Sequence, residues 1–151
     1  MKKLLIIALS AGLLVGIVAM TTSQTSAEAK PMREILPLPP SLFDADGKKI
    51  PTESLRGKVV ALYFSAHWCG PCRQFTPKLV EFRNQNEKNG FEVVFMSLDR
   101  SAQEKKSYMK QEGMKWFNAP DQSTPEIEHI MNFYKLRGIP SMIVFGPNGE
   151  R

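Results

Sequence analysis

The hydrophobic pattern of the chain alternates between short apolar runs and longer stretches with helical spacing. Residues 58–65 and 91–98 are near-continuous apolar runs, which are typical of central strands covered on both faces. Residues 73–88 place apolar side chains at helical intervals, and residues 101–111 predict a more polar helix with Ser101 as its N-cap. This alternation of strands and helices predicts an α/β fold.

Turn and cap signals predict the remaining elements. Residues 42–50 predict a small hairpin around a Gly turn. Residues 126–135 predict an amphipathic helix that Ser123 or Thr124 caps. Residues 141–145 predict a strand that a Pro- and Gly-containing turn ends.

Residues 1–29 have the pattern of an export leader. Lys2 and Lys3 form a positive start, residues 4–20 are an apolar core, and small residues follow in cleavage-like order. We expect a cleaved signal peptide, and an uncleaved N-terminal membrane anchor is the alternative because the apolar core is long for a signal.

Length and charge limit the rest of the chain. Its 151 residues suffice for one domain, which we place at residues 42–151 after a proline-rich linker at residues 30–41. The formal net charge is +5, of which Lys2 and Lys3 carry two, so about +3 remains beyond the leader. That balance is too mild to indicate a nucleic-acid partner.

The two cysteines carry the candidate chemistry. Cys69 and Cys72 flank Gly70 and Pro71 where an apolar strand run meets a helical run. A thiol at a helix start is near free N–H groups and the positive end of the helix dipole, which stabilise a thiolate. The second thiol, one turn later, is close enough to attack a mixed disulfide. The spacing therefore predicts a redox-active dithiol.

The sequence contains no pattern that indicates a metal site or a nucleotide-binding site. A zinc site would need two ligands besides the cysteines, and only His67 and His129 are available as histidines. No Gly-X-Gly-X-X-Gly motif follows a strand, so we predict neither a metal nor a cofactor. Electrons would then have to come from a partner protein.

Two separated motifs resemble the thioredoxin superfamily. Residues 63–73, Tyr-Phe-Ser-Ala-His-Trp-Cys-Gly-Pro-Cys-Arg, are similar to its active-site segment. Residues 138–141, Gly-Ile-Pro-Ser, resemble its cis-proline loop. The resemblance covers residues 55–149 and is closest to the tryparedoxin and nucleoredoxin type, with secreted bacterial thiol–disulfide reductases as near relatives.

The resemblance implies a fold and a set of roles. The fold would be thioredoxin-like, with a central mixed sheet flanked by helices, and would lack the last strand and helix of that fold at the C-terminus. Cys69 would be the nucleophile and Cys72 the resolving cysteine. The residues expected to contact substrate are Trp68, Gly70, Pro71, Ile139 and Pro140, the last in a cis peptide bond.

The resemblance also leaves one role unfilled. The buried acid of thioredoxin falls on Tyr63 here, so proton transfer at Cys72 needs water or another group. By elimination the candidates are Glu81, Asp99 and His67, although each is more typical of a surface residue. Trp116 either lines the surface beside the active site or packs in the core.

We therefore expect a thiol–disulfide oxidoreductase that reduces protein disulfides outside the cytoplasm. Its location would be periplasmic or secreted, and the anchor would tether it to the outer face of the inner membrane. Its partners would be protein disulfide substrates and an upstream electron donor, either a membrane protein or a thioredoxin-type reductase. The alternatives are a disulfide oxidase or isomerase, and a non-catalytic binding module that presents Trp68, Ile139 and Trp116.

Overall fold

The computed structural model describes residue 30, residues 32–121 and residues 124–151. The expected leader at residues 1–29 and the candidate cap Ser123 lie outside the described residues. Among the helices in the described part, none combines the length and the apolar character that a membrane span requires.

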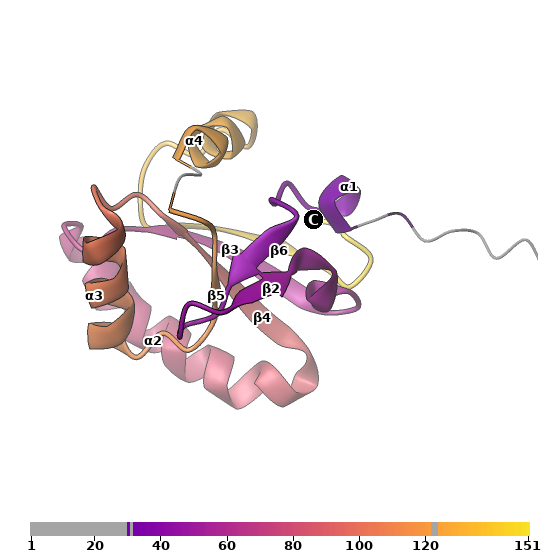
Figure 1. Ribbon diagram of the computed structural model, residues 1–151, viewed down its shortest axis with the longest axis horizontal. Coiled ribbons are helices and arrows are strands. Elements are labelled where there is room, and N and C mark those ends of the chain that lie inside the picture. Colours follow the sequence, from indigo (N-terminus) through magenta and orange to yellow (C-terminus); the bar gives the residue numbers. More distant parts are fainter. Residues whose placement is uncertain (1–29, 31, 122–123) are drawn as a thin grey trace, which may run out of the picture.

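The chain folds into one six-stranded mixed sheet with helices on both faces (Figure 1). The strand order is β2-β1-β5-β4-β3-β6. The predicted α/β class is confirmed. The elements are α1 (Met32–Ile35), β1 (Ser41–Phe43), β2 (Lys49–Pro51), η1 (Thr52–Leu55), β3 (Val59–Ser65), α2 (Gly70–Asn86), η2 (Glu87–Asn89), β4 (Phe91–Ser97), α3 (Ala102–Glu112), β5 (Phe117–Asn118), α4 (Thr124–Phe133) and β6 (Ser141–Phe145).

The centre of the sheet is the pair of strands that the apolar runs predicted. β3 and β4 are parallel, in a register that runs from Val59 opposite Phe91 to Ser65 opposite Ser97. β6 lies antiparallel on the other side of β3. Because strands in the middle of a sheet are covered on both faces, nearly every residue of β3 and β4 is buried.

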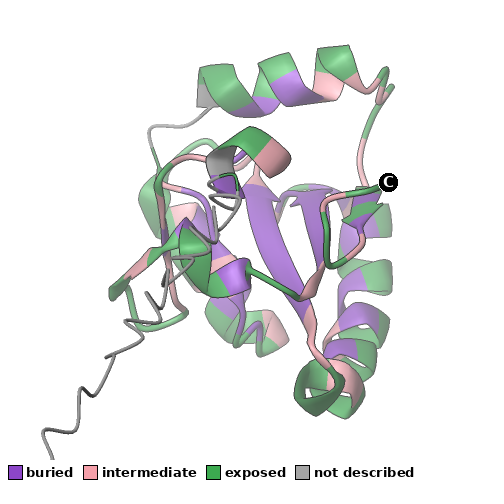
Figure 2. Cartoon of the chain, turned by 90° about the vertical axis from the view of Figure 1, so that its right-hand side faces the viewer, coloured by how far each residue is buried: buried purple, intermediate pink, exposed green. Residues whose placement is uncertain are grey.

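Successive residues of β3 point to opposite faces of the sheet and belong to two separate cores. Val60, Leu62 and Phe64 pack on the face that α1 and α4 cover. Ala61 and Tyr63 pack on the opposite face, against α2 and α3. This follows from the period of two along a strand. Figure 2 shows the central strands as buried between helices whose outer surfaces are exposed.

The expectation of a linker at residues 30–41 is not met by the structure. This segment contains the single helical turn α1, and Met32, Leu36 and Leu38 are buried in the core on the α1–α4 face. Its prolines exclude a long helix but not burial, because the apolar residues between them can still point toward the sheet. The segment is therefore part of the domain.

Local signals explain where several elements begin. Ser101 caps α3 by accepting a hydrogen bond from the backbone N–H of Glu104 at 3.1 Å, as predicted. The predicted hairpin is present as the antiparallel pair β1–β2. The helix expected at residues 73–88 begins earlier, at Gly70, because Cys69 caps it, and its last residues are the 3₁₀ turn η2.

The far end of α2 is fixed by charges. The Arg83 guanidinium donates to both carboxylate oxygens of Glu92, at 3.1 and 3.0 Å, and both side chains are buried. Arg83 also reaches Glu87, whose side chain is 54% exposed. A two-pronged contact of this kind holds a helix in one position along the strand that it covers.

Candidate active site

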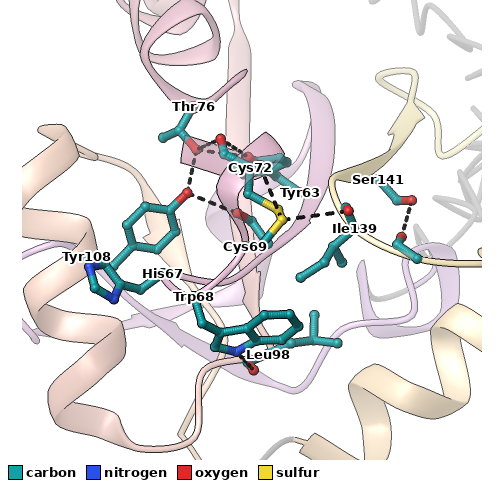
Figure 3. Close-up of a disulfide and its surroundings, with 12 residues drawn as sticks. Tyr63, His67, Trp68, Cys69, Cys72, Thr76, Leu98, Tyr108, Ile139 and Ser141 are labelled. Atoms are coloured by element: carbon teal, nitrogen blue, oxygen red, sulfur yellow. Dashed lines mark hydrogen bonds between the residues drawn. A yellow bond between two sulfur atoms is a disulfide. The ribbon is translucent and has the colours of Figure 1, made fainter. Parts of the chain in front are cut away.

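Cys69 and Cys72 form a disulfide at the N-terminus of α2, with their Cα atoms 5.2 Å apart (Figure 3). Cys69 is the N-cap residue, and its Sγ accepts a hydrogen bond from the backbone N–H of Cys72 at 3.2 Å. Pro71 occupies the first turn, where its missing N–H costs nothing. In the reduced protein the same N–H and the helix dipole would stabilise a thiolate on Cys69.

The two sulfur-bearing residues differ in access. Cys69 retains 6% exposure, whereas Cys72 is fully buried. A substrate disulfide can therefore reach Cys69 first, and Cys72 can act only from within the site. The roles of nucleophile for Cys69 and of resolving cysteine for Cys72 stay predictions.

The loop before Cys69 is held by the end of β4. Trp68 is 52% exposed, and its indole N–H donates to the carbonyl oxygen of Leu98 at 3.1 Å. The backbone N–H of His67 donates to Asp99 Oδ1 at 2.7 Å, and Ser97 Oγ donates to Asp99 Oδ2 at 2.8 Å. The ring of Trp68 is thus fixed beside the disulfide with much of its surface open.

The second sequence motif meets the first across the site. The Ile139–Pro140 peptide bond is cis, as predicted. The carbonyl oxygen of Ile139 lies 3.7 Å from Cys69 Sγ, although the two residues are 70 positions apart. Ser141 Oγ donates to the carbonyl oxygen of Gly138 at 2.6 Å and closes this loop. The substrate contacts expected of Trp68, Gly70, Pro71, Ile139 and Pro140 remain predictions.

Next to Cys72, in the core between the sheet and helices α2 and α3, lies a buried cluster of four hydroxyl groups, which we call the hydroxyl cluster. Its members are Tyr63, Ser65, Thr76 and Tyr108. The position of Tyr63 was found from the sequence, but the contribution of Tyr108 was not. Tyr108 lies on the polar helix α3, and no spacing in the sequence connects it with the cysteines. Burial is the main cause that raises the pKa of Tyr108 above its usual value.

The candidates for the missing acid are placed away from Cys72 or engaged elsewhere. Glu81 is exposed on α2 and accepts from Gln85 at 3.2 Å. Both carboxylate oxygens of Asp99 accept the hydrogen bonds that hold the loop before Cys69. The His67 ring lies edge-on against Tyr108, with 5.8 Å between ring centroids. None of these contacts joins the three side chains to a cysteine sulfur.

Trp116 belongs to the core, which settles the two interpretations of it. It is 1% exposed and lies against Tyr63 with 6.3 Å between ring centroids. Within residues 30, 32–121 and 124–151, no group of three or more His, Cys, Asp or Glu side chains gathers in a way that could hold a metal ion.

The fold and this geometry define the class of the domain, since a Cys-X-X-Cys pair at a helix N-terminus beside a cis-proline loop performs thiol–disulfide exchange. It is a thiol–disulfide oxidoreductase domain. A family model described as Thioredoxin-like matches residues 57–151. The chain therefore belongs to the thioredoxin-like family, of the tryparedoxin and nucleoredoxin type.

Curated and solved relatives agree with this assignment. Probable nucleoredoxin 1 of Arabidopsis thaliana is 39% identical over 106 residues, which cover 70% of this chain and 18% of that protein. Nucleoredoxin of Bos taurus is 38% identical over 123 residues, 80% of this chain and 27% of that protein. The chain thus spans about a quarter or less of the nucleoredoxins that it matches.

Solved structures match over more of their length. Tryparedoxin II from Crithidia fasciculata is 31% identical with a TM-score of 0.71, over 81% of this chain and 83% of that one. Thioredoxin from Wuchereria bancrofti is 44% identical with a TM-score of 0.68, over 76% and 81%. The thioredoxin-like fold expected from the two motifs is confirmed.

Proposed function

We propose that this chain reduces protein disulfides outside the cytoplasm through the Cys69–Cys72 pair. The observation that carries the proposal is the position of Cys69 Sγ, between the N–H of Cys72 and the carbonyl of Ile139. A substrate strand that lies along Ile139 would bring its disulfide against this sulfur. Trp68 offers flat apolar surface next to it.

The reaction needs two thiols and no cofactor. The Cys69 thiolate attacks one sulfur of the substrate disulfide, forms a mixed disulfide and releases the first substrate thiolate. Cys72 then loses its proton, attacks Cys69 Sγ and releases the second. Two electrons pass to the substrate, and the domain is left with the disulfide seen in Figure 3.

The direction of electron flow is the first point to test. The Gly70-Pro71 pair between the cysteines is typical of reducing thioredoxins, whereas strong oxidants carry a histidine before the second cysteine. We expect the redox potential of the Cys69–Cys72 pair to lie near about −270 mV, measured against glutathione mixtures. A value near about −120 mV would favour the disulfide oxidase instead.

Turnover separates the enzyme from the binding module. With a small dithiol as donor, the protein should accelerate the reduction of insulin, and Cys69→Ser should not. The binding-module hypothesis expects Trp68, Ile139 and Trp116 to face a partner. Trp116 is buried, so it cannot do so, whereas Trp68 is exposed and Ile139 is half-buried. Equal insulin reduction by the wild type and Cys69→Ser would restore that hypothesis.

The location and the partners rest on the sequence alone. The pattern of residues 1–29 supports export to the periplasm or secretion, with a tethered form as the alternative. A membrane protein or a thioredoxin-type reductase would then supply electrons. Expression in a Gram-negative bacterium, fractionation and N-terminal sequencing should show mature periplasmic protein that begins after Ala27 or Ala29. Cytoplasmic protein that retains Met1 would contradict export.

A further inference from the structure

The hydroxyl cluster is organised around Thr76, one helical turn after Cys72. Thr76 Oγ1 lies 2.8 Å from the carbonyl oxygen of Cys72, 2.9 Å from the Tyr63 hydroxyl and 2.7 Å from the Tyr108 hydroxyl. The Tyr108 hydroxyl in turn lies 3.1 Å from Ser65 Oγ. All four side chains are buried, so these groups depend on one another for hydrogen bonds.

The direction of each hydrogen bond follows from counting protons. A carbonyl oxygen can only accept, so the single hydroxyl proton of Thr76 goes to the carbonyl of Cys72. Thr76 Oγ1 must then accept from both Tyr63 and Tyr108. Tyr108, having donated its proton to Thr76, accepts from Ser65. Each hydroxyl has one proton to donate. The Tyr63 hydroxyl also lies 3.5 Å from the carbonyl oxygen of Cys72, so Thr76 and Tyr63 both converge on that carbonyl.

Cys72 is thereby held at both ends of its backbone. Its carbonyl oxygen accepts from Thr76, and its N–H donates to Cys69 Sγ at 3.2 Å. Two residues from outside α2 hold Thr76 in this orientation, Tyr63 from β3 and Tyr108 from α3 (Figure 3). A tyrosine hydroxyl is protonated at neutral pH, and burial raises the pKa of Tyr108 still further, so this hydroxyl can donate.

We propose that Thr76 and Tyr108 are positioning residues for the resolving cysteine, which hold Cys72 in line to attack the mixed disulfide on Cys69. The inference rests on the proposed thiol–disulfide exchange. It assigns the hydroxyl cluster to the second step of that exchange and not to the first. Attack by Cys69 depends on its own exposure and on the helix N-terminus, which the cluster does not supply.

A chromogenic aryl disulfide separates the two steps in one experiment. The Cys69 thiolate attacks the reagent, forms a mixed disulfide and releases one coloured aryl thiolate. Cys72 then loses its proton to solvent, attacks Cys69 Sγ, closes the protein disulfide and releases a second aryl thiolate. Stopped-flow absorbance of the reduced full-length protein should show two phases of equal amplitude.

The variants remove hydroxyl groups one at a time. Tyr108→Phe should slow the second phase about five-fold, the factor expected for one neutral hydrogen bond, and leave the first phase unchanged. Thr76→Val should slow it about twenty-fold because the contacts at the centre of the cluster are lost together. Thr76→Ser keeps the hydroxyl and should restore the wild-type rate. Tyr134→Phe, on the other face of the sheet, is the matched control and should change neither phase.

The outcomes are distinguishable. The inference is overturned if the second phase is as fast in Tyr108→Phe and Thr76→Val as in Tyr134→Phe. It is also overturned if the second phase of Thr76→Ser is as slow as that of Thr76→Val. If Tyr108→Phe does not fold, the Thr76→Val and Thr76→Ser pair decides. A wild type that releases only one aryl thiolate per protein would overturn the dithiol function itself. A merely structural role would lower the free energy of unfolding without separating the two phases.

Discussion

The buried residues on the two faces of the sheet differ in kind. On the α1–α4 face, the buried cluster consists of aliphatic residues, methionine, alanine and phenylalanine. On the α2–α3 face, Tyr63 and Tyr108 bring hydroxyl groups into the core, and these bond to Thr76 and Ser65. Apolar contact is non-directional, whereas hydrogen bonds in a dry interior fix the orientation of their partners. One face therefore supplies stability, and the other also sets the geometry of the reaction.

This difference gives a simple expectation for substitutions. Changes on the α1–α4 face should lower the free energy of unfolding and leave the two phases of the exchange reaction unchanged. Changes around the hydroxyl cluster should alter the second phase. Changes at the far end of α2 test whether the seating of this helix depends on contacts remote from the cysteines.

The largest loss of stability is expected for Glu92→Ala. The substitution leaves the buried Arg83 guanidinium without its two-pronged partner, which costs about 3–5 kcal/mol of unfolding free energy. Glu87→Ala is the matched control, since it removes the exposed partner of the same Arg83 and should cost less than about 0.5 kcal/mol. Urea denaturation measures both. Equal losses would mean that the buried contact does not hold α2.

Leu36→Ala is the next largest change and tests the apolar face alone. Leu36 is 1% exposed in the segment that the sequence assigned to a linker. Its truncation should cost about 2–4 kcal/mol through the lost transfer free energy and the cavity left behind. Glu34→Ala, on the exposed side of the same segment, should stay within about 0.5 kcal/mol. A Leu36→Ala protein of wild-type stability would return residues 30–41 to the role of a tether.

A smaller effect on the same face is expected at Gly149. Gly149 and Gly47 both have φ near +84°, so alanine at either position costs about 1–2 kcal/mol of backbone strain. At Gly47 the added methyl group meets open space, whereas at Gly149 it collides with the Ile35 side chain of α1. Gly149→Ala should therefore cost about 1–3 kcal/mol more than Gly47→Ala in urea denaturation. Equal costs would show that α1 moves aside freely.

The sequence predicted the central strands well because their signal is local. The apolar runs that became β3 and β4 need both faces covered wherever they lie in a fold. The cis-proline loop was predicted from a motif that resembles a known family, and not from its chemistry. The burial of Leu36 was missed because the prolines of this segment are a strong signal against a helix, whereas a few spaced apolar residues are a weak signal for a core.

The hydroxyl cluster could not have been predicted in the same way. Thr76 and Tyr108 are 32 residues apart, and Tyr108 belongs to a helix whose pattern is mostly polar. Their contact depends on how α2 and α3 pack on the same face, which no periodicity within either helix specifies. Trp116 was ambiguous for the same reason, since burial of a single aromatic residue is decided by tertiary packing.

The smallest effect is expected for Asp99→Asn, which separates two interpretations of that carboxylate. If Asp99 were the base for Cys72, the amide would slow the second phase many-fold and alter its pH profile. In the structure Asp99 holds the loop before Cys69, because its carboxylate oxygens accept hydrogen bonds from the His67 N–H and from Ser97 Oγ. An Asn side chain keeps one accepting oxygen, so we expect a change of less than about two-fold in either phase.

Asp99→Ala removes both acceptors, which should loosen the Trp68 loop and reduce the rate of the first phase. A pH profile of the second phase that shifts in Asp99→Asn would give this carboxylate a part in the proton transfer after all.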